Sequence, residues 1–241
     1  MTQAWREAGF RTMPPMETFV SGSAHRNDHD LSRVWVLRRE LERASRGWYA
    51  WAHFVPPAGT FGPLYLAGNS GTRTSLRPQG DGSKTNEVHA NALWGATVRI
   101  ARRVAEFGGG VSVEVPASCL AVELPEWKIM VEAHRMFPVQ VDLCAFGLAP
   151  PDSSPAEPLA YRKRVQLWTN MPQLRDVARA CPGGHRHLHA QGAVRVAGRS
   201  HRRSTLADVG PPAFCNAVVQ AFTSSAESEP PPARPPGDTG G

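Results

Sequence analysis

The fold is decided by the stretch Tyr49-Ala50-Trp51-Ala52-His53-Phe54-Val55-Pro56-Pro57-Ala58-Gly59-Thr60-Phe61, where an apolar segment runs directly into a Pro-Pro turn and a loop of small residues. Residues 49–55 are predicted to form a strand, because aromatic and apolar side chains dominate them. In open α/β sheets, the loops at the carboxyl ends of strands form the ligand site. A cysteine at position 58 would be a nucleophile held at such a site, whereas Ala58 has no group that can attack.

Helices and strands alternate along the first part of the chain. Apolar residues at helical spacing predict helices over 30–47 and 84–107, and Gly47 is expected to end the first of them. Short strands are predicted at 111–115 and 139–146. This order predicts an α/β fold that is Rossmann-like, with a mostly parallel sheet and flanking helices.

The predicted boundaries divide the chain into three parts. Residues 1–149 form the α/β domain, 150–222 a small C-terminal appendage with a Cys/His cluster, and 223–241 a Pro-rich tail too polar to pack. The loop 59–82 is long enough to suggest a functional role. Within the appendage the expected elements are one strand and two helices, at 165–169, 173–180 and 212–222.

Composition limits the possible partners and compartments. The 241 residues carry a net charge of +6, and the tail from Thr223 carries −2, so the body carries +8. A basic body permits a polyanionic partner such as DNA. No apolar run reaches the length of about 18 residues that a membrane span needs, and the N-terminus lacks an apolar signal core. Four scattered cysteines then favour reduced thiols inside a cell, in either cytoplasm or nucleus.

Basic residues gather in three short clusters. These clusters lie at 99–103, 162–164 and 201–203. Each alone is typical of a solvated face, but together they permit phosphate binding, which would depend strongly on salt.

A separate group of cysteine and histidine residues could bind a metal ion. Cys181, His185 and His187 lie within one short glycine-containing turn, and Cys144 or Cys215 could supply a fourth ligand. Two thiols and two imidazoles suit structural zinc, although this Cys-x₃-His-x-His spacing is not that of a standard zinc finger. The alternative is a polar, basic loop.

The order of several short motifs resembles that of DNA cytosine-5 methyltransferase-like proteins, which are Rossmann-type and dependent on S-adenosylmethionine. The similarity is to a divergent branch found in phages and in mobile-element reading frames of protists, and it covers residues 4–222. It rests on these blocks: Pro56-Pro57-Ala58-Gly59-Thr60-Phe61, Arg73-Thr74-Ser75, Pro78-Gln79-Gly80, Ala90-Asn91-Ala92-Leu93, Glu114-Val115-Pro116, Asp142-Leu143-Cys144-Ala145-Phe146-Gly147 and Cys181-Pro182-Gly183-Gly184-His185-Arg186-His187.

The resemblance implies a role for particular positions. Methylation of cytosine C5 needs a thiolate that adds to C6, and position 58 would hold it. Glu114 would bind the base edge of a cytosine flipped out of the duplex. Arg73 and Asn91 would contact the nucleic acid. Residues implied for cofactor binding are Glu17 at the ribose, Asp30 near the adenine, and Pro56.

Departures from the family pattern indicate a degenerate protein. Ala58 replaces the nucleophile and Val115 replaces the family's asparagine. Because residues 4–10 resemble the helix that follows the cofactor-binding turn, the first strand of the sheet is expected to be missing. Amino-directed methyltransferases are not a substitute, since Val55-Pro56-Pro57-Ala58 lacks the polar first residue and the aromatic last residue of their motif.

Structural roles remain open for several of these residues. Pro56-Pro57 could be a plain turn, Asp30 a helix N-cap, and Glu17 a surface carboxylate. Glu114 and Asn91 could both face solvent. The sequence therefore predicts a truncated, inactive methyltransferase-like protein, with a non-catalytic nucleic-acid-binding protein as the alternative.

Overall fold

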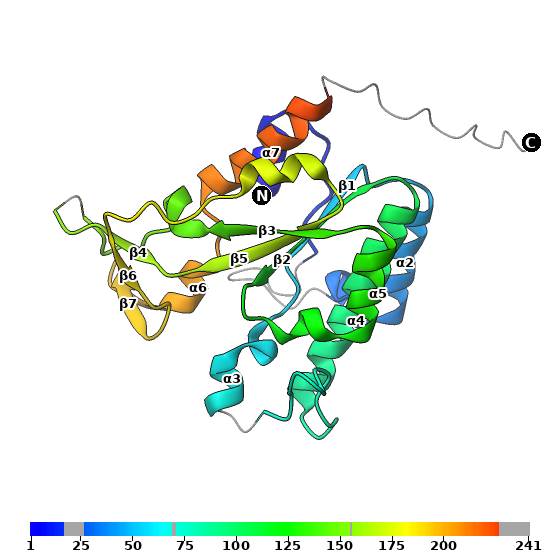
Figure 1. Cartoon of the computed structure of the whole chain (residues 1–241), viewed down its shortest axis with the longest axis horizontal. Helices are drawn as coiled ribbons and strands as arrows, with labels where there is room; N and C mark the ends of the chain where they lie inside the picture. The colour runs from blue at the N-terminus through cyan, green and yellow to red at the C-terminus, as the bar shows by residue number, and fades with distance from the viewer. Residues whose placement is uncertain (17–26, 69–70, 155, 227–241) are drawn as a thin grey trace, which may run out of the picture.

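The computed structural model describes residues 1–16, 27–68, 71–154 and 156–226, and it has a mixed α/β architecture (Figure 1). A four-stranded sheet lies at its centre, in the order β1 (Trp51–Phe54), β2 (Gly110–Pro116), β5 (Arg164–Thr169) and β3 (Phe137–Asp142). β1 and β2 are parallel, and β5 is antiparallel to both β2 and β3. Three of these four strands therefore run in one direction, and the predicted mixed α/β class with a mostly parallel sheet is confirmed at this level.

Helices cover both faces of the sheet. On one face lie α2 (Val34–Ser45), α4 (Thr85–Glu106) and α5 (Pro125–Ala133), packed on the valines of β2. On the other face α1 (Thr2–Glu7) and α7 (Pro212–Ala226) pack over β3 and β5. Because side chains alternate across a strand, these two faces form separate apolar cores.

Two of the predicted helices can be compared directly with the structure. α4 agrees with the prediction over 84–107 to within one residue at each end. α2 begins at Val34 rather than at Asp30, whose carboxylate instead accepts hydrogen bonds from Ser32 in the turn before the helix. The N-cap role of Asp30 was therefore wrong. Gly47 does end α2, with a φ of +67° that glycine adopts at little cost.

Other boundaries differ because 3₁₀ turns replace the expected regular elements. The strand expected over 139–146 ends at Asp142 and continues as a 3₁₀ turn, and the helix expected over 173–180 is a 3₁₀ helix. The loop 59–82 holds a 3₁₀ turn and a short helix. The elements concerned are η4 (Leu143–Phe146), η5 (Pro172–Val177), η2 (Gly59–Phe61) and α3 (Pro63–Gly68); η1 (Asn27–His29) and η3 (Leu120–Glu123) are further 3₁₀ turns.

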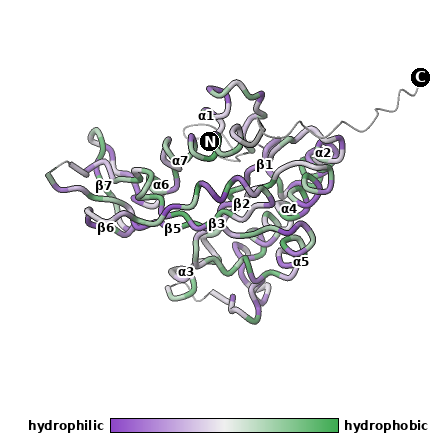
Figure 2. The backbone as a smooth tube through the Cα atoms, turned by 45° about the horizontal axis from the view of Figure 1, so that its top comes forward, coloured by the Kyte–Doolittle hydropathy of each residue, from purple (hydrophilic) through white to green (hydrophobic). Residues whose placement is uncertain are grey.

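The C-terminal part contains two small two-stranded sheets. β4 (Leu159–Tyr161) pairs with β6 (Arg186–Leu188), and β7 (Ala193–Val196) pairs with β8 (Arg199–Arg202), which α6 (Arg203–Ala207) follows. These elements project at the end of the molecule away from α2 and α4 (Figures 1 and 2).

The expected boundary at residue 150 does not separate the central sheet from the rest of the chain. β5 follows that boundary and lies between β2 and β3, where hydrogen bonding on both of its edges fixes its place. α7 continues to Ala226, so the expected tail does not begin at Thr223; its remainder, 227–241, lies outside the described residues. No helix in the described ranges combines the length and the apolar character that crossing a membrane requires.

Trp94 holds the strand-end loop against the helical layer. Its side chain is fully buried between the rings of Phe61 and Trp127, and its Nε1–H donates to the carbonyl oxygen of Pro57 at 2.9 Å. The loop after β1 is thereby attached to α4 through its backbone.

We expect Trp94→Ala to lower the free energy of unfolding by about 3–5 kcal/mol, because it leaves a large cavity and an unpaired carbonyl. Urea denaturation measures this loss. Trp94→Phe keeps an aromatic ring and loses the hydrogen bond, so it should cost clearly less. Equal denaturation midpoints for Trp94→Ala and the wild type would contradict this role.

Candidate metal centre

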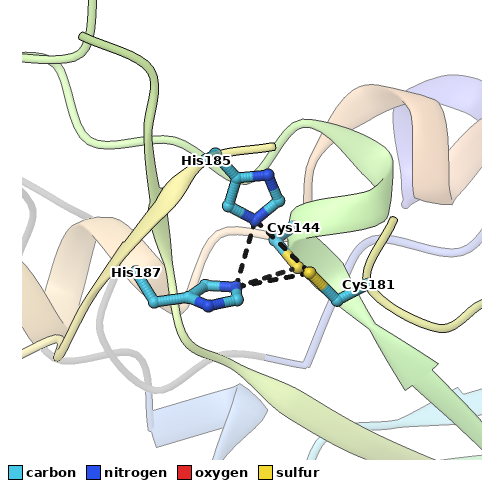
Figure 3. Close-up of side chains that lie close together, drawn as sticks. All are labelled: Cys144, Cys181, His185 and His187. Atoms are coloured by element: carbon cyan, nitrogen blue, oxygen red, sulfur yellow. Dashed lines mark hydrogen bonds between the residues drawn. The ribbon is translucent and has the colours of Figure 1, made fainter. Parts of the chain in front are cut away.

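Two cysteines and two histidines converge at the junction between the central sheet and the C-terminal part (Figure 3). The ligand atoms of Cys144, Cys181, His185 and His187 all lie within 4.8 Å of one another. Cys181 Sγ lies 3.5 Å from His185 Nε2 and 3.6 Å from His187 Nε2, and Cys144 Sγ lies 3.4 Å from His187 Nε2. The group can therefore hold a metal ion, as the sequence predicted, and Cys144 is the fourth member.

Four of the six separations between the ligand atoms can be compared with the edges of a tetrahedron around one ion. With metal–sulfur distances of about 2.3 Å and metal–nitrogen distances of about 2.05 Å, a zinc tetrahedron has S···N edges of about 3.6 Å and N···N edges of about 3.4 Å. The S···N separations agree to within about 0.2 Å. The two Nε2 atoms lie 3.1 Å apart.

Local backbone structure explains why these four side chains meet. Gly183 and Gly184 have φ values of +76° and +75°, so the chain reverses between Cys181 and His185. His185 and His187 are two residues apart at β6, so both point to one side of it. Cys144 enters from η4, directly after β3.

Cys215, the alternative fourth ligand, does not belong to the group. It lies on α7 and is buried in the apolar core. There it is a small apolar side chain within the packed interior.

Asp142 supports the site from outside it, a role that the sequence analysis did not assign. Its carboxylate receives two hydrogen bonds from Arg164, at 2.7 and 2.9 Å, and one from the backbone N–H of Cys181 at 2.9 Å. Hydrogen bonds of this kind, made to a ligand residue by a residue that does not itself bind the metal, orient metal ligands. The available signal was its position two residues before Cys144.

The pKa shifts of Cys144 and His187 act in opposite directions on metal binding. Burial, followed by the neighbouring Cys181 sulfur, raises the pKa of Cys144 to about 11. Burial, followed by the charges of His185 and Arg162, lowers the pKa of His187 and so favours the neutral imidazole, which is the form that binds metals. A bound cation would favour loss of the thiol protons.

The strand-end positions singled out in the sequence belong to two neighbouring parallel strands and the loop that follows one of them. Ala58 follows β1, and Glu114 lies towards the carboxyl end of the adjacent parallel strand β2. Glu114 is not solvent-facing, because its side chain is only 11% exposed and lies 4.0 Å from Nε2 of His53. Burial raises the pKa of the Glu114 carboxyl and lowers the pKa of His53 to about 4.

Arg73 and Asn91 are brought together, but their polar groups are used within the protein. The Arg73 guanidinium donates to Asn91 Oδ1, to Thr60 Oγ1 and to the backbone carbonyl oxygens of Pro78 and Glu87, and it stacks 3.6 Å from the centre of the Phe61 ring. It is only 3% exposed. Asn91 in turn donates to the carbonyl oxygen of Gln79 at 2.8 Å. Neither residue is a free nucleic-acid contact in this conformation.

The expected cofactor positions are only partly described. Glu17 lies outside the described residues. Asp30 is buried in the turn before α2 and bonds to Ser32, and Pro56 is buried at the end of β1.

Comparisons with protein-family models, curated proteins and solved structures give no match for this chain. Functional inference therefore rests on the residues and the geometry described above.

The buried His53 imidazole predicts a pH dependence of stability. Its pKa is about 4 in the folded state and 6.5 ordinarily, so its contribution is fully present above about pH 6.5 and is lost as pH falls towards 4. Between these pH values the His53 imidazole should change the free energy of unfolding by a total on the order of 3 kcal/mol. His53→Asn should remove this change and so make the plot of unfolding free energy against pH less steep.

Urea denaturation at several pH values measures this slope. Glu114 acts in the opposite direction, because its raised pKa makes stability fall as pH rises above its ordinary value. Comparison of His53→Asn with the exposed control His89→Asn isolates the histidine contribution. Identical slopes in the two variants would show that His53 ionises normally in the folded protein.

Proposed function

We propose that Cys144, Cys181, His185 and His187 bind one zinc ion in a structural role. The observation that carries this proposal is the convergence of four ligand atoms within 4.8 Å of one another, with S···N separations close to those of a zinc tetrahedron and a supporting carboxylate behind Cys181. Two thiolates and two imidazoles are the ligands of structural zinc, and four protein ligands leave no open position for a substrate.

Zinc at this position would cross-link three separate parts of the chain. Cys144 belongs to η4 beside the central sheet, Cys181 follows η5, and the two histidines belong to the β6 region. The β4/β6 and β7/β8 sheets have only two strands each, and such small sheets are marginally stable by themselves. An ion that fixes β6 to the body would compensate for their small core.

We further propose that the whole protein is a degenerate, non-catalytic relative of the cytosine-5 methyltransferases that retains binding to nucleic acid. The βαβ unit formed by β1, α4 and β2 supports a Rossmann-like ancestry, since it brings Ala58 and the buried Glu114 to the carboxyl ends of two neighbouring parallel strands. A protonated carboxyl, as burial favours for Glu114, could donate a hydrogen bond to a base edge. Ala58 offers no thiolate beside it.

The charge distribution supports nucleic acid as the partner. Residues 162–207 contain ten arginines and lysines against one acidic residue, Asp176, and so carry +9. The whole chain carries +6, so the remaining residues carry −3. Positive charge is thus concentrated in the part of the chain that surrounds the metal centre, as expected for a surface that binds phosphates.

For the zinc proposal, we expect about one zinc per chain when the protein is purified without chelator and analysed by mass spectrometry for metals. Cys181→Ser and His187→Ala should lose most of the metal. His189→Ala, an exposed histidine outside the group, is the matched control and should keep it.

Chelation tests the structural role separately. Removal of zinc should lower the melting temperature of the wild type, because the ion binds the folded state, and should have little effect on Cys181→Ser. Absence of zinc in the wild type, or equal retention in all variants, would overturn the site.

For the non-catalytic proposal, the protein should bind a DNA duplex with an affinity that falls steeply with salt, and should transfer no methyl group from S-adenosylmethionine. Fluorescence anisotropy and a tritiated methyl-transfer assay measure the two properties. Methyl transfer by the wild type would contradict the loss of catalysis, whereas failure to bind DNA at low salt would contradict the retained binding.

A further inference from the structure

The β7–β8 hairpin is a tight ribbon at the end of the molecule remote from α2 and α4 (Figures 1 and 2). Its two strands are antiparallel and are joined at Ala197 and Gly198, whose φ values are +47° and +78°. Two central residues with positive φ are typical of a type I′ turn, whose twist matches that of the strands. The hairpin is therefore a regular two-stranded element with a defined register.

Exposed arginines lie on both faces of this hairpin, with Arg199 on the face opposite to Arg195 and Arg202. In the register, Arg195 lies opposite Ser200 and Ala193 lies opposite Arg202, so Arg195 and Arg202 are diagonal neighbours on one face. Arg199 begins β8 beside the turn. All three residues are exposed, and none has a side-chain hydrogen bond or ion pair within the ranges that the structure describes.

The base of the hairpin is fixed to the rest of the protein. Arg203, directly after β8, makes two hydrogen bonds to Asp152, at 3.1 and 2.7 Å, and its backbone N–H donates to the carbonyl oxygen of Gly192. Arg203 is largely buried, with 17% of its side chain exposed. One arginine thus anchors the ribbon, while the other three remain available to a partner.

We propose that the β7–β8 hairpin enters the major groove of duplex DNA, with Arg195, Arg199 and Arg202 as its contacts. This inference rests on the proposed binding to nucleic acid and specifies the surface. A two-stranded ribbon fits a major groove about 12 Å wide, and arginine forks bind phosphate oxygens or the O6 and N7 atoms of guanine.

The surface of the hairpin fits DNA better than an anionic membrane. Its turn consists of alanine and glycine, and Val194 and Val196 are half-buried. The hairpin therefore presents no large exposed apolar side chain that could enter a bilayer, as membrane-surface elements do.

The experiment compares two triple variants of the zinc-loaded full chain. Arg195→Ala/Arg199→Ala/Arg202→Ala removes the hairpin charges. Arg11→Ala/Arg38→Ala/Arg135→Ala removes three exposed arginines elsewhere that also lack a side-chain hydrogen bond or ion pair among the described residues. Both variants lose the same net charge, and circular dichroism melts should show that both remain folded, because every replaced side chain is exposed.

Binding is measured by fluorescence anisotropy with a mixed-sequence duplex of about two helical turns, between about 50 and 200 mM salt. Each lost phosphate contact lowers the slope of log affinity against log salt by about 0.9. For the hairpin variant, the magnitude of this slope should therefore fall by between about 2 and 3. Its affinity at about 150 mM salt should fall roughly tenfold or more, whereas the slope and the affinity of the control variant should change little.

Other outcomes distinguish this inference from the function on which it rests. Equal losses in the two variants would show that net charge alone acts and would overturn the hairpin site while leaving DNA binding intact. Tighter binding of the wild type to the matching single strand than to the duplex would overturn insertion into a groove. No binding of the wild type to any DNA at low salt would overturn the proposed function itself. Hairpin-dependent binding to phosphatidylserine vesicles in place of DNA would identify a membrane surface instead.

Discussion

The antiparallel pairing of β5 with both β2 and β3 is the constraint on which the rest of the structure depends. Its register places Arg164 opposite Asp142, where the guanidinium binds both carboxylate oxygens. One of those oxygens also accepts the backbone N–H of Cys181, so the strand pairing positions a residue 17 positions after Arg164. Convergence of the metal-binding group is thus a consequence of how the central sheet is assembled, and the group needs no zinc-finger spacing.

The same sheet buries a small group of polar side chains. Glu114 lies opposite Leu167 of β5, and on this face of β2 and β1 it is accompanied by Ser112 and His53, which are hydrogen-bonded at 2.9 Å. Burial shifts the pKa values of Glu114 and His53 in directions that favour their neutral forms. Groups perturbed in this way are concentrated at functional sites, which makes this cluster a place to look for function.

Local patterns in the sequence predicted local structure well and predicted spatial assembly poorly. Helical periodicity located α4 to within one residue, and Gly47 marked the end of α2, because both depend on neighbouring residues. Three of the four metal-binding residues were found together for the same reason. The sequence offered both Cys144 and Cys215 as the fourth ligand and could not decide between them. That decision depends on β5 lying between β2 and β3, and no local sequence pattern indicates this arrangement. Arg73 resembled a nucleic-acid contact, but only the fold shows that it is buried and donates to the backbone carbonyls of Pro78 and Glu87.

The loop after β1 is fixed by residues that lie far from it in the sequence. Trp94 holds this loop through the backbone carbonyl of Pro57, and Arg73 holds it through Thr60 and the Phe61 ring. None of these contacts uses the side chain at position 58. A cysteine there could therefore be replaced by alanine at little cost in stability, whereas loss of Trp94 would damage the fold. The hydrogen bonds and ring contacts that hold this loop are thus independent of the side chain at position 58.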